Sequence, residues 1–195
     1  MAKGFSESEK KIIKDKLINA AEICWSKYGI KKTTVDELAK MADISKGAFY
    51  LFYQTKELLF LDVLERTDKR TRTVMLGLLK TSKDSRKQKF INSIREMFLE
   101  LKKSPWIFNL QNGDYEFLVR KLPEETVKKH VINDENEFSE MLKYFNVEYD
   151  HGFISAALKA LFFMHLHENE IGEKYFDETM MLFIETIANL VMKEE

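Results

Sequence analysis

The stretch from Thr33 to Leu59, TTVDELAKMADISKGAFYLFYQTKELL, is the most informative part of this chain. Thr34 opens a T-x-x-E capping box, which predicts that a short helix begins at Val35. Ser45 favours the N-cap position and predicts the start of a second short helix. The stretch therefore predicts two short helices joined by a tight turn at Asp43-Ile44, in the manner of a helix-turn-helix.

The second predicted helix has the features of a helix that enters a DNA groove. Gly47 in its first turn costs about 1 kcal/mol of helix stability relative to alanine. The absent side chain lets a phosphate or a base edge come close, which would justify that cost. Phe49 and Tyr53 are four residues apart and share a face that we expect to pack inward. Tyr50 then points elsewhere, where its hydroxyl can reach a phosphate.

This pattern resembles the DNA-binding domain of the TetR family of one-component transcriptional regulators, over roughly residues 8–60. The residues that match the family pattern in register are Thr33, Thr34, Leu38, Ala39, Ala42, Ser45, Gly47, Phe49, Tyr50, Tyr53, Lys56 and Leu59. One departure is Asp43, where the family usually has glycine; aspartate tolerates a left-handed backbone better than most residues. A second is Leu51-Phe52, where hydrogen-bonding side chains are common.

The resemblance implies an all-α protein with two domains. Residues 1–55 would form a three-helix DNA-binding head, and residues 56–195 a helical ligand-binding and dimerisation body. The expected contacts to a double-stranded DNA operator are Thr34, Ser45, Lys46, Gly47, Ala48, Tyr50, Leu51, Phe52 and Lys56.

Charge is unevenly distributed along the chain. The 195 residues carry a net charge of −1, but residues 1–56 hold 11 basic and 7 acidic residues, a net +4. The remainder carries −5. A basic N-terminal part followed by an acidic part agrees with a DNA-binding head on a body that avoids DNA.

The rest of the chain reads as helix, because it has only 2 prolines and 7 glycines and no sustained strand pattern. Capping and breaking residues place the predicted helices at about 6–28, 56–80, 85–103, 105–112, 115–121, 123–145, 151–171 and 174–193. The 56–80 helix would connect the head to the body.

The last two predicted helices indicate an interface. The helix from His151 is apolar around nearly its whole circumference, which predicts burial on all sides. A chain of this size can rarely supply that alone, so we expect a homodimer with a four-helix interface; a purely internal core helix is the alternative. The expected interface residues are Phe153, Ala157, Leu161, Phe176, Met180, Phe183 and Ile187.

Aromatic residues in the middle of the body are candidates for an effector pocket, although they could equally form core. The candidates are Trp106, Phe108, Tyr115, Phe117, Phe162, Phe163 and His165. An apolar lining with few polar groups suits a small lipophilic effector.

No catalytic motif is present, so we expect neither an enzyme nor a cofactor. His165 and His167 are two apart on a helix and point in divergent directions, which argues against a metal site. Cys24 is the only cysteine and is expected to be a buried, inert thiol. The sequence shows no secretory signal, and its most apolar stretch, residues 153–166, is too short to span a bilayer. We therefore expect a cytoplasmic protein.

The sequence as a whole predicts a homodimeric transcriptional repressor that a small ligand releases from its operator. The alternative is a helix-turn-helix dimer without a small-molecule inducer, which a protein partner controls or which acts on DNA architecture.

Overall fold

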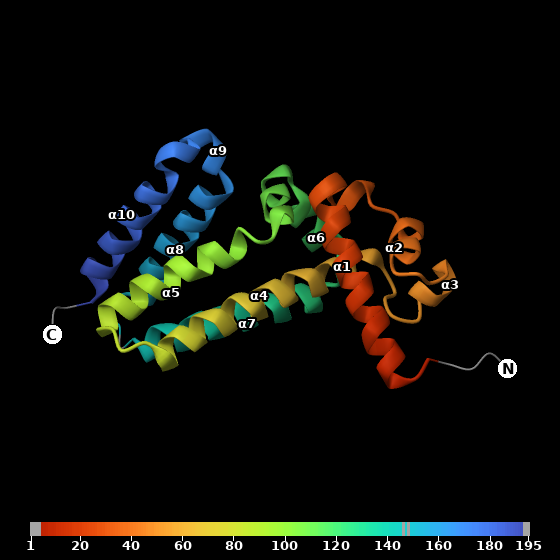
Figure 1. Cartoon of the computed structure of the whole chain (residues 1–195), viewed down its shortest axis with the longest axis horizontal. Coiled ribbons are helices and arrows are strands. Elements are labelled where there is room, and N and C mark those ends of the chain that lie inside the picture. The colour runs from red at the N-terminus through yellow and green to blue at the C-terminus, as the bar shows by residue number, and fades with distance from the viewer. Residues whose placement is uncertain (1–4, 146, 148, 193–195) are drawn as a thin grey trace. The chain divides into compact units, whose positions relative to one another are not determined.

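The computed structural model describes residues 5–145, 147 and 149–192, and for residues 131–140 it describes the backbone only. Every regular element within these residues is helical, so the all-α prediction is confirmed (Figure 1). The elements are α1 (Glu7–Lys32), α2 (Val35–Met41), α3 (Lys46–Phe49), α4 (Lys56–Thr81), α5 (Arg86–Leu101), the 3-10 helix η1 (Pro105–Asn112), α6 (Asp114–Lys121), α7 (Glu124–Tyr144), α8 (His151–Leu166), α9 (Glu168–Ile171) and α10 (Glu173–Val191).

Local signals in the sequence set most helix boundaries. Ser6 and Glu9 form both bonds of the predicted capping box at the start of α1. Asp150 caps α8 by accepting a hydrogen bond from the main-chain N–H of Phe153 at 2.6 Å. Two boundaries were predicted wrongly. Helix α1 continues to Lys32 past a kink at Gly29, where the sequence predicted its end. Helix α8 ends at Leu166 and not near residue 171, because the chain leaves the helical path at His167 before the short helix α9.

The chain folds into two compact units, and the first is discontinuous in sequence. It comprises Met1–Asp68 and Ser104–Pro123, whereas the second comprises Lys69–Lys103 and Glu124–Glu195. Helix α4 passes from the first unit into the second. The first unit therefore reaches past the division at residue 55 that the sequence suggested, and that division remains a prediction about function.

The core of the first unit joins η1 to α1 through aromatic side chains. Trp25 stacks on Trp106 with ring centroids 4.2 Å apart, and the ring of Phe60 meets Trp25 edge-on at 5.3 Å. All three side chains are buried. Since these rings are among the largest in the unit, their burial is a major source of its stability.

A buried carboxylate fastens α6 to the end of α1. One oxygen of Asp114 accepts hydrogen bonds from the indole N–H of Trp25 at 2.9 Å and from the main-chain N–H of Ile30 at 3.0 Å. Gly29 makes this approach possible, because its φ of 75° kinks α1 and a Cβ there would lie 3.0 Å from the same oxygen. No pattern in the sequence indicates this link.

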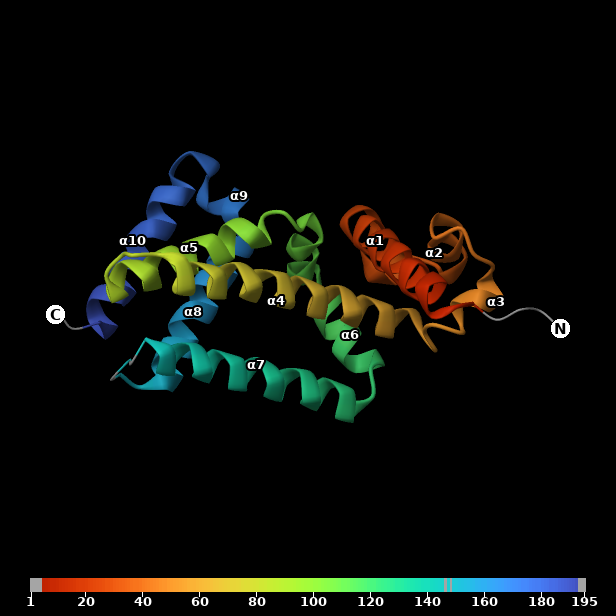
Figure 2. The ribbon, with the colours of Figure 1, turned by 60° about the horizontal axis from the view of Figure 1, so that its bottom comes forward.

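In the second unit, α10 packs against α5 and α8, and α8 packs against α7 (Figure 2). The inward face of α10 consists of Phe176, Met180, Ile184, Ala188 and Val191. The inward face of α8 consists of Ile154, Leu158, Leu161, His165 and Leu166. None of the helices described is long and apolar enough to cross a membrane.

Replacing Asp114 with alanine should destabilise the first unit by about 2–5 kcal/mol. The substitution leaves two buried N–H groups without an acceptor, and each costs about 1–3 kcal/mol. Urea unfolding followed by tryptophan fluorescence measures this selectively, because the two tryptophans of the chain, Trp25 and Trp106, lie in this unit.

Glu116→Ala is the matched control for Asp114→Ala. Glu116 is an exposed acid in the first turn of the same helix, so its loss should cost less than about 1 kcal/mol. Equal unfolding midpoints for the two variants would contradict the role assigned to Asp114.

Candidate nucleic-acid interface

Helices α2 and α3 form the predicted helix-turn-helix. The hydroxyl of Thr34 accepts from the main-chain N–H of Glu37 at 3.2 Å, and that of Ser45 accepts from Ala48 at 3.1 Å. Asp43 in the turn has a φ of 60°, the left-handed conformation expected where the TetR pattern carries glycine. The residue-level prediction for this segment is therefore confirmed in its helix starts and its turn.

The second helix of the motif continues as a turn of backbone hydrogen bonds beyond Phe49. The N–H of Leu51 donates to Ala48 O at 3.1 Å, and those of Phe52 and Tyr53 both donate to Phe49 O, at 2.9 and 3.0 Å. Residues 46–53 therefore present a helical surface of about two turns, in which positions three or four apart lie on one side.

The inner side of this surface is fixed to α1 and α4. Phe49 and Tyr53 are buried, as predicted. The Tyr53 hydroxyl donates to Asp62 of α4 at 2.7 Å, and the same carboxylate accepts from Lys14 of α1 at 2.8 Å. Burial, together with the Asp62 carboxylate, raises the pKa of Tyr53, so the phenol keeps its proton and remains a donor at neutral pH.

The outer side carries most of the residues predicted to contact DNA. Tyr50 is 49% exposed and Leu51 is 75% exposed. Phe52 lies against the ring of Phe5, with centroids 5.8 Å apart. The Lys46 ammonium donates to Asp36 at 2.7 Å, and this hydrogen bond raises its pKa. Both partners of that ion pair are largely exposed, so water or a phosphate can readily replace Asp36.

Gly47 lies on this outer side in open space. A Cβ at this position would have Ser45 Oγ, at 3.9 Å, as its only neighbour within 4 Å outside the adjoining chain. Its φ is not in the left-handed region. Packing and backbone conformation of the protein therefore do not require glycine here, whereas close approach of a ligand would.

Lys56 has a structural role that the sequence did not indicate. Its ammonium donates to the main-chain carbonyls of Ile30 at 2.8 Å and Thr33 at 2.6 Å, with a longer contact to Lys31. Burial lowers its pKa. The side chain thus joins the start of α4 to the end of α1, and its proposed phosphate contact would have to compete with these carbonyls.

These features define a helix-turn-helix DNA-binding module. Its inner side is bonded to α1 and α4, and its outer side is exposed to solvent. Residues 17–63 match the family model described as "Bacterial regulatory proteins, tetR family". The N-terminal part of the chain is therefore a DNA-binding domain of the TetR family, which is a family of non-enzymatic transcriptional regulators.

Sequence similarity to known regulators is concentrated in this module. QacR of Staphylococcus aureus is 40% identical over 52 residues, which are 27% of this chain and 28% of QacR. YuxN of Bacillus subtilis is 41% identical over 73 residues, 37% of this chain and 25% of YuxN. The matched region thus spans about a quarter of the length of these relatives.

Solved structures resemble the chain over most of its length. The regulator FadR from Bacillus subtilis, solved in complex with stearoyl-CoA, aligns with a TM-score of 0.66 and 16% identity, covering 91% of this chain and 99% of that one. A TetR-family regulator from Rhodococcus aligns at 0.64 and 17% identity, covering 94% of this chain and 100% of that one. At these identities the likeness concerns the fold.

The predicted effector-pocket residues do not belong to one unit. Trp106, Phe108, Tyr115 and Phe117 lie in the first unit, and Phe162, Phe163 and His165 lie in the second. Trp106 is occupied in the aromatic core on Trp25. Phe163 is 62% exposed on the surface of α8. The sequence could not distinguish core positions from pocket positions, because aromatic side chains are common in both.

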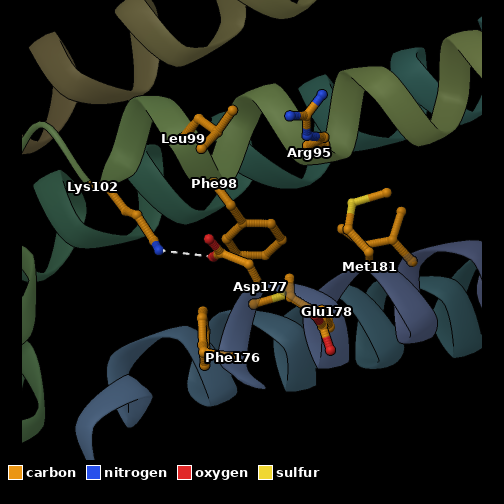
Figure 3. A pocket seen from close by; sticks show the side chains of 10 residues that line it. Arg95, Phe98, Leu99, Lys102, Phe176, Asp177, Glu178 and Met181 are labelled. Carbon is orange, nitrogen blue, oxygen red and sulfur yellow. Dashed lines mark hydrogen bonds and ion pairs between the residues drawn. The ribbon is translucent and has the colours of Figure 1, made fainter. Parts of the chain in front are cut away.

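A groove in the second unit, of about 320 Å³, lies between α5 and α10 (Figure 3). Its lining residues are Arg95, Phe98, Leu99, Lys102, Phe176, Asp177, Glu178, Met180, Met181 and Ile184. Phe176 and Met180 were expected from the sequence to lie in the dimer interface, and the other lining residues were not identified from it. No sequence motif connects two helices separated by more than seventy residues.

His165 lies behind the wall of this groove. It is fully buried, with its ring centroid 5.5 Å from that of Phe98 and 6.1 Å from that of Phe176. Burial lowers the pKa of His165, so the imidazole is neutral at pH 7. Among the described side chains, no group of three histidine, cysteine or acidic residues is placed to hold a metal ion.

The predicted interface residues divide into two sets. Leu161, Phe176 and Met180 are buried inside the second unit, so assigning them to a partner surface was incorrect. Phe153 and Phe183 are 49% and 46% exposed. Ala157 and Ile187 are partly exposed. Helix α8 is therefore not buried all round within one chain.

Cys24 is buried, as expected, with its sulfur 3.5 Å from that of Met41. Burial raises the pKa of its thiol to about 11, helped by the negative charge of Glu37. The thiol is therefore protonated and unreactive at neutral pH.

Gly47→Ala should stabilise the fold and weaken DNA binding at the same time. Alanine favours the helix by up to about 1 kcal/mol, while its methyl group would hold the DNA away and cost about 1–3 kcal/mol of a base-edge contact. Thermal unfolding and titration of a duplex selected from a random-sequence library measure the two effects.

Gly77→Ala is the matched control, because Gly77 lies in the interior of α4 with nothing within 4 Å of a Cβ. It should stabilise the protein equally without changing affinity. Unchanged DNA affinity in Gly47→Ala would remove this glycine from the interface.

Proposed function

We propose that this chain is a repressor that binds a double-stranded DNA operator as a homodimer and leaves it when a small lipophilic effector binds. The observation that carries DNA binding is the outward surface of residues 46–53, held rigidly by the hydrogen bonds of Tyr53 and Asp62. Such a protein would act in the cytoplasm, where bacterial DNA is located.

Exposed apolar side chains on α8 and α10 support the homodimer. They include Phe153, Phe163, Leu182, Phe183 and Leu190, each between 46% and 62% exposed. Large apolar side chains repeated along two neighbouring helices usually mark a protein interface. A second copy of the same pair would complete a four-helix interface, and a two-fold dimer would place two α3 helices on successive turns of the major groove, about 34–36 Å apart.

Phe183→Glu should produce folded monomers that no longer bind the operator tightly. The position is half exposed in one chain, so the fold tolerates a charge there, whereas an uncompensated charge buried in an interface costs about 3–5 kcal/mol. Sedimentation velocity measures the oligomeric state, and circular dichroism verifies the fold.

Leu76→Glu is the control for this experiment, since Leu76 on α4 is 41% exposed and outside both helices of the proposed interface. It should remain dimeric. A stable dimer of Phe183→Glu at low micromolar concentration would rule out this interface.

The groove between α5 and α10 is the proposed effector site. Phe98, Leu99, Met180, Met181 and Ile184 supply apolar wall, and Lys102 lies at one end, paired with Glu168 and Asp177 at 3.0 Å each. An apolar wall with a few charged groups suits a small amphipathic molecule. Among the proteins with the same fold, RolR was solved with resorcinol and FadR with stearoyl-CoA.

Release from DNA requires that the effector and the operator favour different states of the dimer. Helix α4 runs from the DNA-binding unit into the unit that holds the groove, so a shift of α4 is the simplest route between them. Because one equilibrium would serve both sites, the effector must weaken operator binding by the same factor by which the operator weakens effector binding.

An effector found by thermal-shift screening of lipophilic compounds should therefore bind free dimer more tightly than operator-bound dimer. Leu99→Arg, which places a bulky charge in the groove, should abolish that binding. Leu76→Arg introduces the same charge at an exposed leucine outside the groove and should not.

Calorimetric titration with and without operator measures the coupling. Equal affinities would exclude release by that compound, and a ligand unaffected by Leu99→Arg would place the site elsewhere. The alternative function, a dimer controlled by a protein partner or acting on DNA architecture, would be favoured if no compound stabilised the protein.

A further inference from the structure

Leu51 is the most exposed of the large apolar side chains in the described part of the chain, at 75%. It lies in the short helical segment that we propose enters the DNA groove. A side chain this exposed buries little apolar surface within the chain, and single exposed leucines are common on protein surfaces. Leu51 is of interest because it lies on the surface that we propose contacts DNA.

The residues that share a side of the helix with Leu51 have small, apolar side chains or none. Its N–H donates to Ala48 O, so Leu51 and Ala48 lie along one side of the turn, and Gly47 is four residues before Leu51. Gly47 is exposed and has no packing reason to be glycine. A flat surface of Gly47 and Ala48 with Leu51 projecting from its end can come close to base edges.

Several side chains near Leu51 contact other parts of the protein. Ser45 Oγ accepts the N–H of Ala48, and Lys46 donates to Asp36. Phe52 packs against Phe5, and Tyr50 lies edge-on to Phe49 with centroids 5.5 Å apart. The part of the surface centred on Leu51 thus offers van der Waals contact in place of hydrogen bonds.

The 5-methyl of thymine is the only apolar group that the base pairs display in the major groove. We infer that Leu51 recognises the 5-methyl group of a thymine in each operator half-site, so that part of the operator sequence is read by apolar contact. This inference rests on the proposed function, because it requires that residues 46–53 enter the major groove.

The test begins with an operator selected from a random-sequence duplex library by the full-length protein. Each thymidine of that operator is then replaced singly by deoxyuridine, which removes only the methyl group and keeps every hydrogen bond. Affinity should fall about four-fold at one position in each half-site, as expected for loss of one buried methyl group.

Variants of Leu51 assign the effect to this side chain. Leu51→Ala should bind the thymidine operator more weakly and lose the discrimination between thymidine and deoxyuridine at that position. Leu51→Met keeps an apolar side chain of similar size and should retain the discrimination. Leu76→Ala, which removes an exposed leucine from α4, should behave as the parent protein in both measurements.

The outcomes separate this inference from the function on which it rests. If no sequence is enriched and no duplex binds, the proposed DNA binding fails and the inference fails with it. If an operator binds tightly but tolerates deoxyuridine at every position, or if Leu51→Ala keeps the same methyl discrimination, DNA binding stands and the inference is overturned.

Discussion

The hydrogen bonds accepted by the buried carboxylate of Asp114 are the interaction on which the first unit, which carries the helix-turn-helix, depends. It accepts hydrogen bonds from the side chain of Trp25 and the main chain of Ile30, and so fixes the end of α1 where the chain turns towards α2. The Lys56 ammonium, at the start of α4, donates hydrogen bonds to the carbonyls of Ile30 and Thr33 at the same end of α1. A carboxylate and an ammonium therefore satisfy main-chain groups at the end of α1. The chain continues from this point into α2 and α3, which carry the outward surface of residues 46–53.

Local chemistry explains why much of this unit could be predicted from sequence. Thr34, Ser45 and Asp43 act within a few residues of their own position, and each does in the structure what its residue type favours. Asp114 and Lys56 act across 84 and 26 residues, between groups with no spacing rule. Lys56 matched the family pattern in register, but the pattern did not reveal that its partners are carbonyl oxygens of the protein itself.

The second unit shows the limit of hydrophobic patterning. Helix α8 is apolar on both sides, so its sequence predicted burial all round and did not indicate which side the chain itself would cover. Leu161 faces the core and Phe153 faces outward, although both are large apolar residues. The choice depends on where α5, α7 and α10 pack, which is information from other parts of the chain. The groove between α5 and α10 was missed for the same reason.

The discontinuity of the first unit has a consequence for biosynthesis. Its two segments are separated in sequence by Lys69–Lys103, which belong to the other unit. While the ribosome makes that intervening segment, on the order of seconds at usual elongation rates, α1 to α3 lack Trp106 and Asp114. Trp25 then has neither its stacking partner nor its acceptor. The packing around Trp25 therefore cannot be completed until Trp106 and Asp114 have been made, so the core of the first unit closes only after part of the other unit has been synthesised.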